Sequence, residues 1–338
     1  MIHLPIEPYK ERYTEHLHEW EKTEFEKHFL YEEVVPEKND ITQIHAGSVL
    51  DKDARSRHCI DQIQQLLHNF KDDLGTVYFS DFYTSGLDAL AYSEKSFKSA
   101  AFCWAQTFDM YDFTYQQSNI MEWMRPYELM AMNIYDAVFV ASPLLYEFMV
   151  TMYPPLKDKI FVVGLPFNSK YISDIAFENG GNYWDEIDVV YSSRWDIEKN
   201  PDFFLDVVEK RDDLTFAVCT GSDDLRGSAV KAIQRAKKLE SEGRLLIFKG
   251  LEKKDYYSIL SSSKVQFNCA YQDWVSFTLL EALTMGCSPV YPNTRSFPDA
   301  LMYQTENLYA PHILNSAIET IDYALENKFV AANTILSY

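Results

Sequence analysis

Residues 189–201 read Val-Val-Tyr-Ser-Ser-Arg-Trp-Asp-Ile-Glu-Lys-Asn-Pro and indicate the fold class. The apolar run at the start predicts a strand, and Pro201 begins a helix with apolar residues at helical spacing. Arg194 and Lys199 follow the carboxyl end of that strand. Open α/β sheets bind ligands at this edge, and two cations beside a helix start suit a diphosphate. The alternative is an ordinary pair of surface cations at a strand–helix junction.

Length and composition indicate a two-domain globular protein. The chain has 338 residues, a hydrophobic fraction of 47% and a formal net charge of −20. This acidic excess argues against a basic membrane-docking face and against tight nonspecific binding of nucleic acid. No apolar run approaches the ~20 residues of a membrane span, and the amino terminus lacks a signal-peptide pattern.

The cysteines indicate a reduced protein. Five cysteines are widely spaced, mostly within apolar runs, and none forms a Cys-x-x-Cys pair. We therefore expect buried thiols, no disulfide, no metal site and a cytoplasmic location.

Predicted strands alternate with predicted helices in two series, which is typical of βαβ units and parallel sheets. In the first series we expect a helix or irregular lead-in at 8–30, strands at 41–45, 76–79, 100–104, 137–141 and 160–163, and helices at 60–70, 126–135 and 143–152. In the second we expect strands at 187–191, 214–219, 244–248, 264–268 and 288–291, and helices at 201–210, 228–241, 253–262, 277–285 and 313–327. The predicted fold class is α/β, with two Rossmann-like domains at 1–168 and 187–338, a linker at 169–186, and parallel sheets facing an interdomain cleft.

Residues 264–292 form a second informative segment, about eighty residues downstream of the first. A predicted strand leads into a loop with Asp273, and the following helix carries Glu281 and ends at Gly286. We expect both carboxylates to point into one cleft, with the backbone amides around 274–277 facing an anionic or polyhydroxyl ligand. Taken alone, Glu281 would be a carboxylate that answers the helix dipole.

Together the two segments resemble the donor half of retaining glycosyltransferases with the GT-B fold. The Glu-x7-Glu and Ala-Met-Ala-x-Gly-x-Pro-Val-Ile elements of that family match Asp273-x7-Glu281-Ala-Leu-Thr-Met-Gly-Cys-Ser-Pro-Val. Ser-Arg-x-Asp-x-x-Lys-Asn matches its phosphate-binding segment, and Phe-Lys-Gly-Leu at 248–251 matches its Phe-x-Gly element under the nucleotide base. Asp273 stands where the family usually has Glu, which leaves the identity of the sugar open.

The resemblance implies transfer of a hexosyl or pentosyl group from a nucleotide diphosphate sugar, without a metal or another cofactor. Arg194 and Lys199 would bind the diphosphate and stabilise it as it leaves. Glu281 would bind the ribose, and Asp273 would bind the transferred sugar with the amides of 274–276. The implied donor-binding residues of this half are Ser193, Gly250, Asp273, Trp274, Val275, Ser276 and Glu281.

The first half would supply the acceptor side. Gly47 and Ser48 follow its first predicted strand, and Gly47 would let the backbone approach the diphosphate. Asp81, Asp109 and Asp112 follow later strands, and aromatic residues beside the last two suit a sugar or a base. Asp109 is the first candidate for a catalytic base, although a polar loop with core aromatics explains the same pattern.

The acceptor is predicted from a further resemblance. Residues 45–51 and 112–128 are similar to phage-encoded glycosyltransferases that act on hydroxymethylated pyrimidines in DNA, which would place the protein in a host cytoplasm. A soluble glycan or protein acceptor is the alternative, as is a non-catalytic two-domain ligand-binding protein. A basic run at 231–244 is either a solvated face or a contact for a phosphate backbone.

Overall fold

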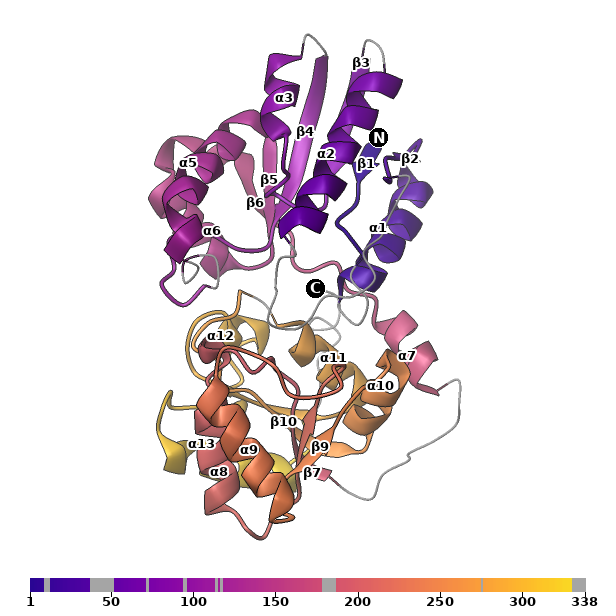
Figure 1. The fold of residues 1–338 in the computed structure, drawn as a ribbon. Coiled ribbons are helices and arrows are strands. Elements are labelled where there is room, and N and C mark those ends of the chain that lie inside the picture. The colour runs from indigo at the N-terminus through magenta and orange to yellow at the C-terminus, as the bar shows by residue number, and fades with distance from the viewer. Residues whose placement is uncertain are drawn as a thin grey trace. The chain divides into compact units, whose positions relative to one another are not determined.

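The structure, a computed structural model, describes residues 1–8, 13–36, 52–70, 73–93, 96–112, 115, 118–177, 187–274 and 276–329. The chain divides into two compact units: an amino-terminal unit of Met1–Ile44 and Ser48–Pro166, and a carboxy-terminal unit of His45–Gly47 and Phe167–Tyr338. Each unit contains a six-stranded sheet with flanking helices (Figure 1). Every described strand pairing is parallel, which confirms the predicted α/β class with two Rossmann-like units.

The amino-terminal sheet has the strand order β2-β1-β3-β4-β5-β6. In chain order the elements are β1 (Ile2–Leu4), α1 (Thr14–His28), β2 (Glu32–Glu33), α2 (Lys52–Asn69), β3 (Asp73–Phe79), α3 (Leu87–Tyr92), β4 (Ser96–Cys103), α5 (Ser118–Ile134), β5 (Ala137–Val140), α6 (Pro143–Met152), a 3-10 turn (Pro154–Lys159) and β6 (Ile160–Val162). Because β1 lies between β2 and β3, the order in which successive strands join the sheet reverses between β1 and β3.

Strands β1 and β2 were missed, because segments of two or three residues are too short to display a period. The strand predicted at 41–45 lies outside the described residues. The helix predicted to begin at Pro126 was wrong: α5 begins eight residues earlier and contains Pro126 in its interior. A proline fits a first helical turn best, but the apolar face of this helix extends on both sides of it.

The carboxy-terminal sheet has the order β12-β11-β10-β7-β8-β9, the arrangement of a doubly wound dinucleotide-binding sheet. In chain order the elements are α7 (Ser169–Phe177), β7 (Ile187–Tyr191), a 3-10 turn (Ile197–Lys199), α8 (Pro201–Lys210), β8 (Phe216–Cys219), α9 (Val230–Ser241), β9 (Leu246–Phe248), α10 (Lys253–Ser261), β10 (Ser263–Phe267), α11 (Phe277–Met285), β11 (Ser288–Pro292), α12 (Phe297–Ala300), a 3-10 turn (Thr305–Asn307), β12 (Leu308–Tyr309) and α13 (Leu314–Glu326). Helix α7 occupies part of the segment predicted to be a linker.

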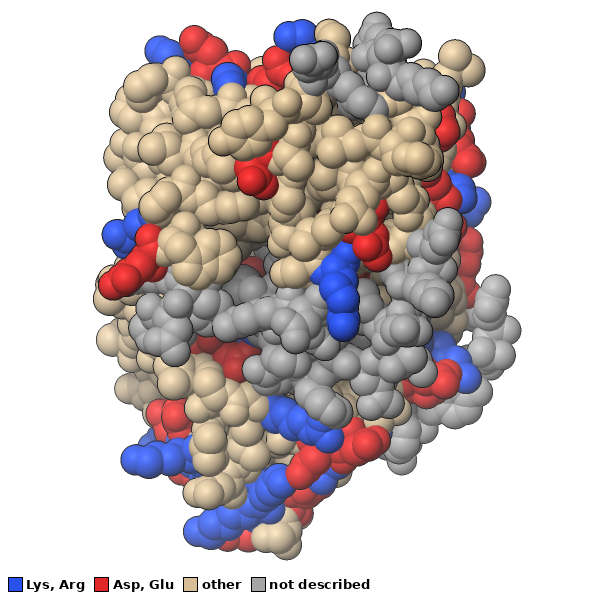
Figure 2. Space-filling model, turned by 45° about the horizontal axis from the view of Figure 1, so that its top comes forward, with Lys and Arg blue, Asp and Glu red and all other residues tan. Residues whose placement is uncertain are grey.

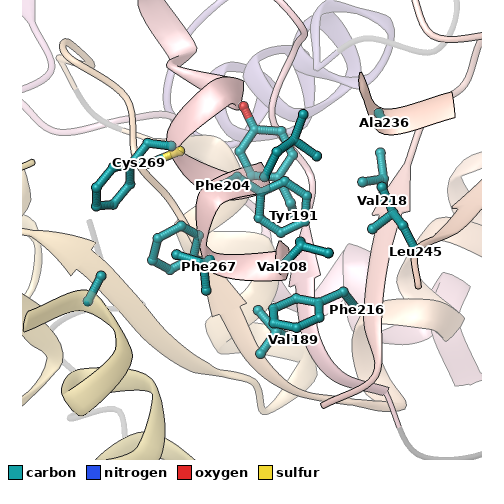
Figure 3. Packing of buried hydrophobic residues seen from close by; sticks show 14 of the residues in the cluster. Val189, Tyr191, Phe204, Val208, Phe216, Val218, Ala236, Leu245, Phe267 and Cys269 are labelled. Carbon is teal, nitrogen blue, oxygen red and sulfur yellow. The ribbon is translucent and has the colours of Figure 1, made fainter. Parts of the chain in front are cut away.

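The core of this unit forms where α8 covers β7, β8 and β10. Tyr191 stacks on Phe204 with ring centroids 4.7 Å apart, and Phe216 and Phe267 pack around the same ring of α8 (Figure 3). All four side chains are buried. Fully burying a side chain of this size contributes about 1.5–3 kcal/mol, so this cluster fixes the position of the β7–α8 connection.

Other predictions concern the cysteines and the surface. All five cysteines are buried, as predicted, and no disulfide links any two of them. Lys and Arg lie among Asp and Glu on the face drawn in Figure 2. Within the predicted basic run, Arg235 pairs with Asp206 and Glu209, and Lys237 pairs with Asp224, which favours a solvated face. In the described part of the chain, no helix is long and apolar enough to cross a membrane.

Candidate active site

The candidate site lies where the carboxy-terminal sheet reverses its strand order, between β7 and β10. In doubly wound sheets, ligands bind outside the carboxyl ends of the strands at this point. Lys199 follows β7 and Asp273 follows β10. The Nζ atom of Lys199 lies 3.2 Å from Oδ2 of Asp273 and 3.3 Å from the carbonyl oxygen of Gln272. The two segments that the sequence predicted to act together are therefore in contact.

Arg194 is fixed by two carboxylates. Its Nη1 lies 2.5 Å from Oδ2 of Asp196, and its Nη2 lies 2.7 Å from Oε1 of Glu198. The backbone N–H and the hydroxyl of Ser228 donate to Oδ1 of Asp196, at 2.9 and 3.1 Å. The guanidinium is oriented by these bonds, and 31% of the Arg194 side chain remains exposed.

Gly227 allows the loop after β8 to lie against the loop after β7. The N–H of Ala229 donates to the carbonyl of Trp195 at 3.0 Å. A Cβ atom on Gly227 would lie 2.0 Å from that same carbonyl oxygen, so a side chain there would force the loops apart. Gly227 was not predicted from the sequence, where its only signal was a glycine after β8, another strand with its carboxyl end at this edge.

Lys199 is positioned by the turn before α8. Asn200 adopts a left-handed conformation with φ of 51°, and Pro201 then begins the helix. The buried hydroxyl of Tyr191 donates to the carbonyl of Lys199 at 3.2 Å. The backbone of Lys199 is thus tied to the core while its ammonium group reaches Asp273.

The loop after β10 is also anchored. The hydroxyl of Ser296 donates to the carbonyl of Asp273. Ser276 is the N-cap of α11, and its hydroxyl accepts a hydrogen bond from the first turn of that helix. Trp274 is buried, and Val275 lies outside the described residues. The structure therefore places Asp273 in the loop before a helix and Ser276 at the amino terminus of that helix, as predicted.

Glu281 of α11 is buried and accepts hydrogen bonds from three side chains of α10. Lys253 Nζ lies 3.0 Å from Oε1, the Tyr256 hydroxyl 2.9 Å from Oε2, and the Tyr257 hydroxyl 3.3 Å from Oε1. Burial, and secondly the charge of Glu281, raises the pKa of Tyr256 well above its usual value, so this hydroxyl remains a donor. Glu281 lies beyond the first turn of α11, so the dipole of that helix does not explain it. The three partners were missed by the sequence analysis.

Ser193 and Gly250 also lie at the carboxyl edge of this sheet. Asn268 Nδ2 lies 3.5 Å from the Ser193 hydroxyl, a long hydrogen bond between the segments after β10 and β7. Gly250 has φ of +63° and its N–H donates to the carbonyl of Ser222 at 2.9 Å. A left-handed turn of this kind favours glycine.

Carboxylates outnumber cations among the charged pairs of this site. The pairs are Arg194 with Asp196 and Glu198, Lys199 with Asp273, and Lys253 with Glu281. The sequence predicts two cations that bind a diphosphate, and in the structure each of them already has an acidic partner. A bound diphosphate would compete with these carboxylates or share the cations with them.

Three other predicted residues lie in the amino-terminal unit. Asp81, Asp109 and Asp112 are buried after β3 and β4. Each accepts a backbone N–H of its own loop, at 2.9 Å for Asp81, 3.0 Å for Asp109 and 3.3 Å for Asp112. Such bonds are typical of carboxylates that shape a turn, and the role of Asp109 as a base stays a prediction. Gly47 and Ser48 lie outside the described residues.

Glu128 is a buried carboxyl group of α5 that the sequence analysis did not single out. It accepts hydrogen bonds from the Thr107 N–H at 3.0 Å, the Tyr153 hydroxyl at 2.8 Å and the Tyr83 hydroxyl at 2.5 Å. Burial raises the pKa of Glu128 despite these donors. The carboxyl group ties α5 to the loop that leads to Asp109. Its only sequence signal was an acid on the apolar face of a predicted helix.

Among the residues that the structure describes, no group of three His, Cys, Asp or Glu side chains is arranged to hold a metal ion. No protein-family model matches the chain. A tRNA-queuosine alpha-mannosyltransferase from Drosophila melanogaster is 29% identical over 127 residues. The match covers 36% of this chain and 32% of that relative, about a third of each protein.

Solved structures share the fold over most of the chain. Sucrose-phosphate synthase from Thermosynechococcus elongatus has a TM-score of 0.67 at 13% identity and covers 96% of this chain and 90% of its own. An alpha,alpha-trehalose-phosphate synthase (UDP-forming) from Burkholderia xenovorans, in complex with glucose-6-phosphate, has a TM-score of 0.61 at 13% identity over 81% and 71% of the two chains. At this level of identity the likeness establishes the fold, which is that of the GT-B glycosyltransferases.

Proposed function

We propose that this protein is a retaining glycosyltransferase that moves a sugar from a nucleotide diphosphate sugar to an acceptor hydroxyl. The contact between Lys199 and Asp273 at the switch point of the carboxy-terminal sheet carries the proposal. It joins the segment expected to bind phosphate to the segment expected to bind the sugar. A fold shared with a UDP-forming synthase and a mannosyltransferase relative support the same function.

In the proposed donor complex, Arg194 and Lys199 contact the diphosphate, and Asp273 and Ser276 contact the transferred sugar. Glu281 binds the ribose, and Ser193 and Gly250 line the nucleotide. The backbone amides of Trp274 and Val275 contact the transferred sugar. As the bond between the anomeric carbon and the phosphate oxygen breaks, negative charge grows on the departing diphosphate. Cations that are already in position stabilise this charge, so no metal ion is required.

The acidic partners of Arg194 are compatible with this role. A guanidinium has five N–H donors, and the ion pairs to Asp196 and Glu198 use two of them, which leaves about three for phosphate oxygens. A planar group held on one edge by carboxylates presents its other edge in a fixed direction. The two acids act by orienting Arg194, at the cost of part of its attraction for an anion.

For the transfer step we propose that the acceptor oxygen bonds to the anomeric carbon on the face that the diphosphate leaves. The departing phosphate oxygen accepts the proton of the acceptor hydroxyl. The configuration at the anomeric carbon is thereby retained, and no side-chain base is needed. Asp109 is the side chain that we assign to this proton if the diphosphate does not take it, with Asp81 and Asp112 as its alternatives.

As the acceptor we propose a hydroxymethylated pyrimidine in DNA, on the resemblance of residues 45–51 and 112–128 to phage-encoded enzymes. A base in a duplex would be flipped out to reach the site. With a net charge of −20, the protein should hold the phosphate backbone weakly.

The similarity to a tRNA-queuosine alpha-mannosyltransferase favours a second candidate, a modified nucleoside in tRNA. In both cases the acceptor is a hydroxyl group on a modified nucleoside of a polynucleotide. The two candidates differ in the nucleic acid that presents that hydroxyl.

One experiment separates these possibilities. The protein is incubated with UDP- and GDP-sugars and with unmodified DNA, hydroxymethylated DNA or bulk tRNA, and the digested nucleosides are weighed by mass spectrometry. A hexose or pentose added only to hydroxymethylated nucleosides is the expected result. Addition to a tRNA nucleoside establishes the second candidate. If the protein binds nucleotide sugars but catalyses neither their transfer nor their slow hydrolysis, it is a ligand-binding protein and the proposal is contradicted.

A further inference from the structure

Glu281 has fewer acceptor positions open than a ribose diol could use. An ionised carboxylate offers about four lone-pair positions, two on each oxygen. Oε1 accepts from Lys253 at 3.0 Å and from Tyr257 at 3.3 Å, so both of its positions are taken. Oε2 accepts from Tyr256 at 2.9 Å, which leaves one position. No other described residue donates to this carboxylate.

The surroundings of Glu281 agree with this count. The Glu281 side chain is 7% exposed and that of Lys253 is 19% exposed, while Tyr257 is buried. Lys253 Nζ also lies 5.2 Å from the ring centroid of Tyr256 and 5.5 Å from that of Tyr257. An ammonium held by a carboxylate and two aromatic faces has several interactions to lose if it moves aside.

We infer that Glu281 recognises a single ribose hydroxyl through Oε2, and that Lys253 keeps Oε1 from a second one. Lys253 is therefore a specificity-determining residue that acts through Glu281. The inference rests on the proposed function, because it requires that Glu281 faces the ribose of a nucleotide donor. It adds that the two ribose hydroxyls contribute unequally to binding.

The wild-type protein provides the first test. UDP, GDP and ADP are titrated by calorimetry, and the tightest ligand is then compared with its 2′-deoxy and 3′-deoxy forms. Loss of a hydrogen bond to a charged group weakens binding about tenfold to a hundredfold. We expect one deoxy form to bind about tenfold or more weakly, and the other to bind within about twofold of the parent.

Lys253→Met provides the second test, since methionine keeps an unbranched side chain but has no donor for Oε1. One position on Oε1 then opens, and removal of the previously indifferent hydroxyl should weaken binding about tenfold. Lys254→Met is the matched control. Lys254 is the adjacent lysine, 51% exposed and paired with Glu252 at 3.2 Å. Its replacement should leave the affinities of the 2′-deoxy and 3′-deoxy forms, each relative to the parent nucleotide, as they are in the wild type.

The outcomes distinguish the inference from the proposed function. Equal penalties for the two deoxy forms in the wild type would overturn recognition of one hydroxyl. If removal of the hydroxyl that does not affect binding in the wild type also leaves binding unchanged in Lys253→Met, the role of Lys253 is overturned. If neither deoxy form is penalised, Glu281 does not bind ribose, although a nucleotide that still binds and turns over leaves the enzyme proposal standing. Absence of binding to all three nucleotides would contradict the proposed function itself.

Discussion

Lys199 and Asp273 are 74 positions apart in the sequence, yet Nζ of one lies 3.2 Å from Oδ2 of the other. The contact joins the two loops that follow β7 and β10. We expect Lys199→Met to lower kcat/KM for sugar transfer about 100- to 1,000-fold, the usual cost of removing one preorganised group that stabilises the leaving charge. Steady-state kinetics with a saturating acceptor measures this loss.

The control for Lys199 is Lys238→Met. Lys238 is 75% exposed on α9 and pairs with Glu242 at 3.7 Å. Its removal should change the free energy of unfolding by no more than about 0.5 kcal/mol and kcat/KM by no more than about twofold. Equal activity of Lys199→Met and Lys238→Met would remove Lys199 from the donor site.

The role of Arg194 should depend on the shape of its side chain as well as on its charge. In Arg194→Lys the cation is kept, but a single ammonium cannot bind Asp196, Glu198 and a phosphate in one plane. We expect a fall in kcat/KM of about tenfold or more, with a midpoint of thermal unfolding near that of the wild type. Arg194→Gln should lose both activity and stability, because the buried Glu198 is left without its cation. Wild-type kinetics in Arg194→Lys would contradict a bidentate role.

Residues 189–201 show how much of the candidate site could be predicted from the sequence. The strand, the turn and the helix were predicted because apolar spacing and Pro201 are local signals. The convergence of Lys199 and Asp273 was also predictable, since the carboxyl ends of parallel strands share one edge. The donors to Glu281 were not, because Lys253 and two tyrosines begin a helix whose rotation about its axis depends on packing alone.

Glu128 predicts a pH dependence of stability. Burial raises the pKa of this carboxyl in the folded protein, so the native state holds its proton more tightly than the unfolded chain. Its stabilising contribution is complete below the unfolded pKa, about 4.3, and is lost as the pH rises through the folded pKa. In Glu128→Gln the group cannot ionise, so the free energy of unfolding should fall less between pH 5 and pH 8 than in the wild type. Urea unfolding at the two pH values measures the difference, and equal pH slopes would refute a raised pKa.

Gly227 should tolerate no side chain. In Gly227→Ala the new methyl group would lie 2.0 Å from the Trp195 carbonyl oxygen, so the loop carrying Arg194 must shift. We expect a loss of about 1–3 kcal/mol in stability and weaker nucleotide binding. Gly243→Ala is the control: φ is +71° there and no atom lies within 4 Å of the added methyl, so only backbone strain is introduced. Nucleotide affinity should fall in the first variant alone, and a fall in both would contradict a steric cause.

Because all five thiols are buried, thiol-reactive reagents should modify the intact protein only slowly. Burial also raises the pKa of Cys103, Cys219, Cys269 and Cys287, which keeps the reactive thiolate scarce. The rate at which a maleimide consumes native cysteine then becomes a clock for transient opening of the chain. A single cysteine introduced on the surface could carry a fluorophore without prior removal of the others, and would report donor binding by its emission.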